Sequence, residues 1–335
     1  MSEHNNPDIA PGSKENAGSD RPIEASIYWN NICILNKKEL TLLEELAAEL
    51  AQEGIILKVR QFGLGYPEHL SEHLRNPQNP LPDIIVSADL EVYEDYRVFS
   101  RFQQQLYAAA NWVKRDDDPR LDAVYRHDTL LPYVVIPLVL YSKDRSSFAD
   151  KGLEEIVIEM LPLHFGGINN SAGKSVVKLV WDRLGRDAAC ALLQRCEVAE
   201  IPVVAFQAAR RETHSAALVP TAFALTADGR KSHAICPSDG APVVPSYIAA
   251  RKSLPEVVAR RIVEGLTSER FLEMFVNAGR LIAWKANSPK DEWVATQCSR
   301  LQLPRPDFFA QVSPEEFYQL YCSAIPSARM PDTYA

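Results

Sequence analysis

The segment from Ser232 to Ser253 constrains the fold of this chain more than any other stretch. A short run with strand character, His233 to Cys236, leads through the turn Pro237 to Gly240 into a second apolar run, Pro242 to Ala250. β-Branched and aromatic residues bounded by Pro and Gly are typical of strands, and the Asp-Gly pair suits the turn because glycine tolerates positive φ. The segment therefore predicts two strands joined by a turn, with a helix expected after Pro255.

A matching apolar run, Leu131 to Tyr141, predicts a strand that leaves the first part of the chain before the later segment crosses back. The chain of 335 residues exceeds one average domain, and 46% hydrophobic residues can build one large core or two smaller ones. We therefore expect two lobes. The expected division is a disordered tail over residues 1–24, a first lobe of residues 25–141 and 236–335, and a second lobe of residues 142–235.

The first lobe opens with a strand, a helix and a second strand. The strand Ala25 to Trp29 precedes a helical apolar pattern over Lys37 to Gln52, and the next strand runs from Ile55 to Arg60. This unit predicts a parallel sheet of the α/β class because such crossovers are right-handed. The short apolar strand Asp83 to Val86 follows, and Tyr93 to Ala110 is expected to be helical.

In the second lobe, we expect further strands and helices. The expected strands are Ile156 to Leu161 and Ile201 to Phe206, and the expected helices are Ser171 to Leu184 and Arg186 to Cys196. Near the end of the chain, Pro314 to Cys322 is a further expected helix.

The order of these segments from Ile27 to Ala283 resembles the extracellular solute-binding proteins of ABC transporters, in the broad group that includes iron(III) and anion binders. The stretches that carry the resemblance are YWNNIC, DIIVSAD, VIPLVLYSKD and CPSDGAPVVPSYIAARKS. The resemblance implies a type II periplasmic-binding-protein fold: two lobes, each a mainly parallel sheet flanked by helices, joined by two hinge strands. It also implies reversible capture of a small anionic or metal-containing solute by hinge closure, without covalent chemistry and without a cofactor.

Ligands of open α/β sheets lie outside the carboxyl ends of the strands, where Ser87 and Asp89 follow the DIIV strand. The residues that the resemblance places at the ligand are Trp29, Asn30, Asn31, Cys33, Ser87 and Asp89 in the first lobe, and Asn169, Asn170, Ser171, Arg210, Thr213 and His214 in the second. The last candidate is Asp239, in the segment Ser232 to Ser253 that crosses back and that we call the return crossing, although a role in the turn is favoured for it. Iron(III) binders of this group offer adjacent tyrosines in the second lobe, and this chain has no tyrosine between Tyr141 and Tyr247.

Two other functions compete with solute capture. An enzyme on the same fold would use Cys33 as a nucleophile with His214, because a thiol needs a base or a positive field to become a thiolate. An adaptor without a small ligand would have a cleft that lacks convergent polar groups. The stretch GINNSAGKS resembles a phosphate-binding loop, but its glycine spacing is wrong, so a helix start with a solvent-facing Lys174 is favoured.

The composition limits which partners and which location can be expected for this protein. The formal net charge of −8 disfavours nucleic acid as a partner. The sequence contains no run of the roughly 18 to 20 apolar residues that a membrane-spanning helix needs. Six cysteines without regular spacing favour reduced core thiols over a disulfide framework. The polar start lacks a secretory signal, so a cytoplasmic location is expected; a periplasmic location with an ABC permease as partner is expected only if the native start lies further upstream.

Overall fold

The computed structural model describes residues 21–305, 307–325 and 327–328. Its strands form a sheet in the order β2-β1-β3-β9-β4-β7-β5-β6, with β8 and β10 paired to β4 and β11 paired to β9. The strands are β1 Ile23–Asn30, β2 Ile55–Phe62, β3 Ile84–Ser87, β4 Leu131–Ser142, β5 Leu163–Gly166, β6 Glu197–Ala199, β7 Ala216–Pro220, β8 His233–Ile235, β9 Ala241–Ala250, β10 Ile282–Ala283 and β11 Leu301–Gln302.

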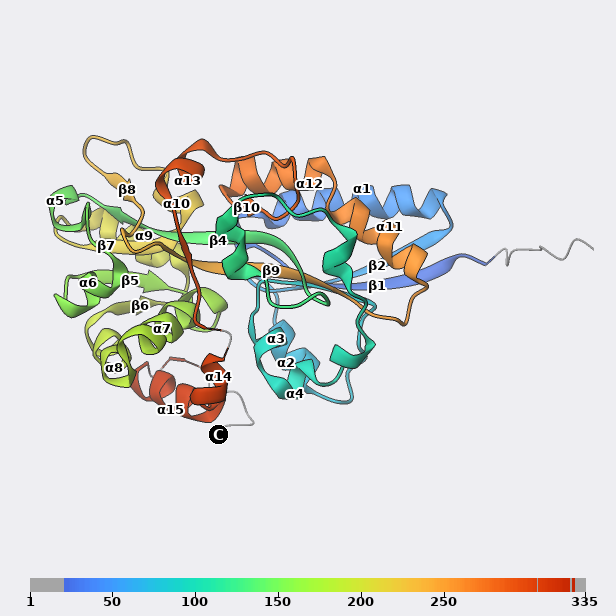
Figure 1. The fold of residues 1–335 in the computed structure, drawn as a ribbon, viewed down its shortest axis with the longest axis horizontal. Helices are drawn as coiled ribbons and strands as arrows, with labels where there is room; N and C mark the ends of the chain where they lie inside the picture. Colours follow the sequence, from blue (N-terminus) through green and yellow to red (C-terminus); the bar gives the residue numbers. More distant parts are fainter. Residues whose placement is uncertain (1–20, 306, 326, 329–335) are drawn as a thin grey trace, which may run out of the picture.

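The helices flank this sheet on both faces (Figure 1). They are α1 Asn36–Gln52, α2 Leu70–Arg75, α3 Glu91–Glu94, α4 Tyr96–Phe99, α5 Arg145–Phe148, α6 Leu153–Ile158, α7 Ser171–Leu184, α8 Arg186–Arg195, α9 Pro202–Arg211, α10 Thr221–Ala224, α11 Glu256–Leu266, α12 Glu269–Glu273, α13 Glu292–Gln297, α14 Phe308–Gln311 and α15 Pro314–Ala324. Short 3₁₀ turns lie at Cys33–Leu35, Gln103–Gln105, Ala109–Trp112 and Pro119–Val124, and a π turn lies at Met274–Ala278.

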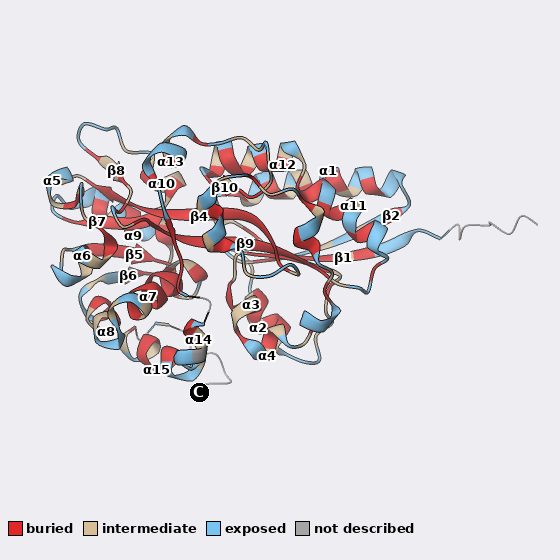
Figure 2. Cartoon of the chain, viewed as in Figure 1, coloured by how far each residue is buried: buried red, intermediate tan, exposed pale blue. Residues whose placement is uncertain are grey.

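The long strands β4 and β9 run through the middle of the molecule and join its two halves (Figure 1). They pair antiparallel from Leu131 opposite Ile248 to Pro137 opposite Val243. We call β2, β1 and β3 the first half, attached through β9, and β7, β5 and β6 the second half, attached through β4. All of β9 and all of β4 except Ile136 are buried, as Figure 2 shows, which explains why both strands are continuous apolar runs in the sequence.

The first half follows the predicted strand-helix-strand order. β1 pairs parallel with β2 on one side and with β3 on the other. Helix α1 buries Leu43, Leu46 and Leu50 at helical spacing and ends before Gly54, whose φ of 77° is left-handed. Helix α11 packs closely on α1, since a Cβ on Gly265 would lie 2.4 Å from the Cδ1 atom of Leu46. The sequence predicted these elements to within a few residues.

The second half is built on β5, which is parallel to both β6 and β7. Helix α9 packs against β5 and β7, and α7 and α8 pack against each other and against α15. The rings of Trp181 in α7 and Phe317 in α15 lie 6.2 Å apart. The predicted lobe boundaries stay a prediction; α15 packs on α7 and α8 of the second half and also contacts α3 of the first half through Tyr318.

Three predicted elements are wrong. The segment predicted as the strand Ile201 to Phe206 forms the N-cap and first turns of helix α9, because Pro202 starts the helix and Ala205, Phe206 and Ala209 line one buried face. The apolar strand follows it instead, as β7. The sequence alone did not separate the two because short apolar runs fit either structure.

Helix α6 replaces the strand predicted at Ile156 to Leu161, and the true strand is β5, immediately after it. The helix predicted over Tyr93 to Ala110 is broken into α3, α4 and 3₁₀ turns. It breaks at Asp95, whose extended backbone ends α3 and whose carboxylate accepts the N–H of Arg97 at the start of α4.

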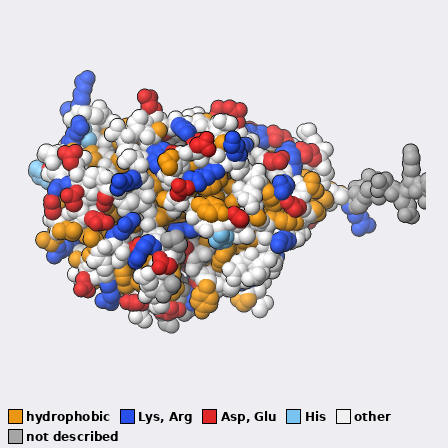
Figure 3. Space-filling model, in the orientation of Figure 1, with side chains coloured by type: hydrophobic (Ala, Val, Ile, Leu, Met, Phe, Trp, Pro, Cys, Tyr) orange, Lys and Arg blue, Asp and Glu red, His pale blue; other side chains and the backbone are white. Residues whose placement is uncertain are grey.

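Among the described residues, no helix is long and apolar enough to cross a membrane. Lys and Arg side chains are interspersed with Asp and Glu side chains over the face shown in Figure 3. That mixed surface agrees with the modest net charge of the sequence.

The contact between α1 and α11 makes a stability prediction. Leu46→Ala removes a fully buried side chain, so the free energy of unfolding should fall by about 2–5 kcal/mol. Leu64→Ala is the control: its side chain is 49% exposed, and the change should cost less than about 0.5 kcal/mol. Urea unfolding of both variants measures the difference, and equal losses would contradict this packing.

Candidate functional site

Strands from the two halves point their carboxyl ends at one another, and the loops that follow them meet. Ser87 ends β3, and residues 88–90 lead into α3; Gly166 ends β5, and residues 167–170 lead into α7. The N–H of Leu90 donates to the Oγ atom of Ser171 at 2.8 Å. This buried hydrogen bond joins the two halves at the place where α/β sheets bind ligands.

The loop after β3 is ordered by its own polar groups. The N–H of Asp89 donates to the Oγ atom of Ser87 at 2.9 Å. The carboxylate of Asp89 accepts the N–H of Ser71 in α2, at 3.2 Å, and that of Glu91, at 3.3 Å. Burial, followed by the charge of Glu91, raises the pKa of Asp89, while Lys174 acts in the opposite direction. Asp89 is thus a buried carboxyl group with a cation close by.

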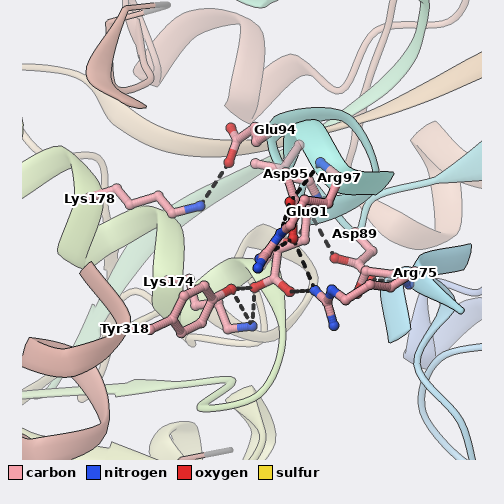
Figure 4. A network of polar contacts seen from close by, with 12 residues as sticks. Arg75, Asp89, Glu91, Glu94, Asp95, Arg97, Lys174, Lys178 and Tyr318 are labelled. Carbon is pink, nitrogen blue, oxygen red and sulfur yellow. Dashed lines mark hydrogen bonds and ion pairs between the residues drawn. The ribbon is translucent and has the colours of Figure 1, made fainter. Parts of the chain in front are cut away.

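A network of buried ion pairs crosses from the first half to the second (Figure 4). Glu91 accepts from Lys174 of α7 and from the hydroxyl of Tyr318 of α15. One turn further along α7, Lys178 donates to Glu94 at 2.7 Å. Arg75 of α2 lies 4.0 Å from Glu91. We call these residues, together with Asp95, which pairs with Arg75 at 3.2 Å, the bridging network.

The geometry of the bridging network comes from helix periodicity. Glu91 and Glu94 are three residues apart on α3, and Lys174 and Lys178 are four apart on α7, so each pair presents two charges on one face. Glu91 and Lys174 are each only 8% exposed. Burial opposes the charge of Glu91, but Lys174, Lys178 and Arg75 outweigh it and hold the pKa of Glu91 below its usual range.

The loop after β5 is fixed from both ends. The Oδ1 atom of Asn170 caps α7 by accepting the N–H of Ala172 at 2.9 Å. The hydroxyl of Tyr321 in α15 donates to the carbonyl oxygen of Ile168 at 2.8 Å. A Cβ on Gly173 would lie 2.6 Å from the carbonyl oxygen of Gly167, so glycine is needed for this close approach. The C-terminal helix therefore supports the loop as well as supplying Tyr318.

Several predicted site residues gather here. Ser87, Asp89, Asn170 and Ser171 lie at the junction of the two halves, and Asn169 belongs to the same loop. Asn30 ends β1 beside Ser87, because Trp29 pairs with Val86 in the parallel register.

Other predicted residues of the first half serve the fold. Asn31 bonds in both directions to the backbone of Leu64, at 3.1 Å each. Trp29 is buried, and its ring lies 6.3 Å from that of Tyr133. Cys33 lies in the 3₁₀ turn after β1, and its side chain is outside the described part of the structure.

The predicted cluster of Arg210, Thr213 and His214 lies at the opposite edge of the second half. β7 runs parallel to β5 with Ala216 beside Leu163, so the residues just before β7 are at the amino ends of these strands. The side chain of His214 is 85% exposed and lies 3.6 Å from Asp144. The enzyme hypothesis requires His214 to lie next to Cys33. His214 instead lies at the opposite edge from the loop that holds Cys33.

Asp239 caps a helix, in line with its expected role in the turn. Its carboxylate accepts the N–H groups of Leu153, at 2.9 Å, and Glu154, at 3.2 Å, at the start of α6. A Cβ on Gly152 would lie 2.5 Å from the Cγ atom of Asp239, so the capping contact is close. Asp239 therefore ties the return crossing to the second half.

Sequence reasoning missed Arg75, Glu91 and Tyr318 and placed Lys174 in solvent. Lys174 is buried instead, because Glu91 and Tyr318 cover it. The spacing of the two acids on α3 and of the two lysines on α7 was the sequence signal that could have revealed Glu91 and the burial of Lys174. Tyr318 gave no signal, since α15 reaches the site only through the tertiary fold.

Behind the loop after β1 lies a second buried acid, Glu39 of α1. The N–H of Ile32 donates to both carboxylate oxygens of Glu39, at 3.2 Å each. Burial raises the pKa of Glu39 from 4.5 to about 8, although the hydrogen bond from Ile32 opposes this. Among the residues that the structure describes, no three His, Cys, Asp or Glu side chains gather closely enough to hold a metal ion.

Comparison with known proteins identifies the fold. No protein-family model matches the sequence, and no curated protein does. Among solved structures, the apo ferric ion-binding protein A of Pasteurella haemolytica is similar with a TM-score of 0.65 and 14% identity, over 91% of this chain and 97% of that one. A periplasmic thiamin binding protein is similar with a TM-score of 0.62 and 14% identity, over 92% and 98%. Iron-bound HitA from Pseudomonas aeruginosa is similar with a TM-score of 0.63 and 15% identity, over 90% and 99%.

These similarities extend over nearly the whole chain and confirm the expected α/β fold of type II periplasmic binding proteins. At such identities they show the fold alone. The ligands named for those proteins belong to them, and the site of this chain has to be judged from its own residues.

The raised pKa of Glu39 makes stability depend on pH. A carboxyl group that holds its proton more tightly when folded contributes stability below its unfolded pKa of 4.5, and this contribution is lost as the pH rises through about 8. Between these values stability should fall by at most roughly 1.4 kcal/mol per pH unit. Glu39→Gln should flatten this slope and Glu44→Gln, on the exposed face of α1, should not. Urea unfolding from pH 5 to pH 8 measures both, and equal slopes would contradict the assignment.

The bridging network predicts strong coupling between Glu91 and Lys174. Lys174→Met leaves the buried carboxylate of Glu91 without its lysine partner and should lower the free energy of unfolding by about 3–5 kcal/mol. The double variant Glu91→Leu, Lys174→Met should lose much less than the sum of the single losses, because no charge is left unpaired. Chemical unfolding of the wild type and the three variants completes the cycle. Additive losses would mean that the two side chains do not interact.

Proposed function

We propose that this chain is a solute-binding protein that captures a small anionic ligand between its two halves. The observation that carries the proposal is the convergence of Arg75, Lys174 and Lys178, from both halves, on the carboxyl ends of β3 and β5. Ser171, at the start of the 14-residue helix α7, adds a hydroxyl to this place, where the helix dipole favours negative charge.

The charged side chains at the junction of the two halves favour an anionic ligand over a neutral one. Lys174 and Lys178 are satisfied by Glu91 and Glu94 of the opposite half, so an incoming anion can take the place of those carboxylates. Arg75 also has a buried Nε atom without a hydrogen-bond partner. A guanidinium group suits carboxylate or phosphate oxygens because it offers a planar fork of donors.

The central strands support capture by closure. In the main strand path of the described residues, only β4 and β9 lie between the two halves, so bending them moves one wall of the site relative to the other. An anion that enters between the halves would then be enclosed as the walls meet. A metal-containing ligand is not favoured by the described His, Cys, Asp and Glu side chains. An ABC permease as partner and a cytoplasmic location remain predictions from the sequence.

Thermal unfolding with small anions tests the proposal. A panel of inorganic phosphate, sulfate, dicarboxylates and amino acids is added to the wild type at increasing concentration. A ligand that binds only the folded state stabilises it by about 2.7 kcal/mol at a hundredfold excess over Kd, which raises Tm measurably. We expect a saturable rise with at least one of these anions.

Two lysine variants give the matched comparison. Lys174→Met should remove the response to the anion, while Lys231→Met, in the exposed loop before β8, should keep it. Circular dichroism establishes that each variant is folded before titration. No response to any anion, or equal responses from both variants, would contradict a binding site at the bridging network.

A further inference from the structure

Two cysteine thiols that are far apart in sequence meet at the edge of the second half. Cys236 directly follows β8, and Cys298 directly follows α13. The neighbouring thiol of Cys298, together with burial, raises the pKa of Cys236. Cys298 is fully buried in a cluster with Val139, Tyr141 and Val294, and Cys236 packs against the same cluster at intermediate exposure. Both are free thiols in this structure.

The backbone on the C-terminal side of each cysteine keeps the pair in place. β11 runs parallel to the start of β9, with Leu301 beside Ala241. The N–H of Ala241 donates to the carbonyl oxygen of Arg300 at 3.0 Å, and the side chain of Gln302 donates to the carbonyl oxygen of Gly240 at 3.3 Å. The thiols are therefore neighbours because two chain segments are paired beside them.

Arg120 lies beside the two cysteines. The guanidinium group of Arg120 donates to the carbonyl oxygens of Val294, at 3.0 Å, and Cys298, at 2.6 Å. Asp118 orients it through hydrogen bonds to Nε and Nη2. The positive charge of Arg120 opposes the rise in the pKa of Cys236, because it favours the thiolate, the form in which cysteine reacts.

We propose that Cys236 and Cys298 form a disulfide by thiol–disulfide exchange with a small-molecule disulfide. In the first step the thiolate of Cys236 attacks one sulfur of the oxidant, forms a mixed disulfide and releases one small thiolate. The thiolate of Cys298 then attacks the Sγ atom of Cys236 and releases the second. The two thiols lose their protons to solvent, and the oxidant is reduced to two small thiols, so atoms and electrons balance.

The bond would clamp the return crossing. It would tie the turn between β8 and β9 to the segment between α13 and β11, on the side where Asp239 holds α6. A cross-link that closes a long loop stabilises the folded chain by restricting the unfolded one. Because Cys298 is buried, we expect the exchange to proceed mainly while the chain folds. The proposal does not depend on the anion site.

Peptide mapping of the wild type tests the proposal directly. The chain is refolded with oxidised and reduced glutathione, free thiols are alkylated, and trypsin cuts after Lys231, Arg251, Lys290 and Arg300. Each cysteine then lies in its own peptide, residues 232–251 or residues 291–300. We expect a cross-linked peptide pair that disappears after dithiothreitol. Tm should rise by about 3–8 °C on oxidation.

Variants supply the controls. Cys236→Ser and Cys298→Ala should each abolish the cross-linked pair and the rise in Tm, while Cys190→Ser on α8 should keep both. The mapping of the wild type does not depend on whether a variant folds. Recovery of both peptides in alkylated form, glutathione attached to Cys236 without a cross-link, or a dominant bond to another cysteine would each overturn the proposal.

Discussion

The ion pair between Glu91 and Lys174 is the interaction on which the arrangement of this molecule depends. Two charges that are each 8% exposed are costly to bury, and the cost is offset only while they remain together. Because Glu91 comes from the first half and Lys174 from the second, the pair stabilises one relative position of the two halves. The hydrogen bond from Leu90 to Ser171 and the contact of Tyr318 with Glu91 act at the same place.

The central strands β4 and β9 explain how the ion pair between Glu91 and Lys174 can affect function. If β4 and β9 were a rigid slab with many further connections, breaking the ion pair would only weaken the fold. Instead the two halves are joined mainly through these two strands, so the contacts at the carboxyl ends of β3 and β5 decide how closely the halves approach. A small anion that competes with Glu91 for Lys174 would act on the same balance. This links the structure of the junction to the proposed capture of a solute.

How far the sequence could predict this structure depends on whether the signal is local. The central strands and helices α1 and α7 could be predicted, because long apolar runs and helical spacing are properties of neighbouring residues. Helix α9 could not, since Ile201 to Phe206 is β-branched and apolar and its helical face appears only against β5 and β7. At the site, Ser87, Asp89 and Ser171 were found through their position after strands or at a helix start. Lys174 and Tyr318 were not, because only the tertiary fold brings α3, α7 and α15 together.

Small-angle X-ray scattering of Lys174→Glu tests the central claim most directly. This change sets a carboxylate against Glu91, so like charges would face each other across the junction. If the bridging network holds the halves together, the radius of gyration should increase relative to the wild type while the far-ultraviolet circular dichroism stays the same. A scattering curve identical to that of the wild type, from an equally folded variant, would contradict the account.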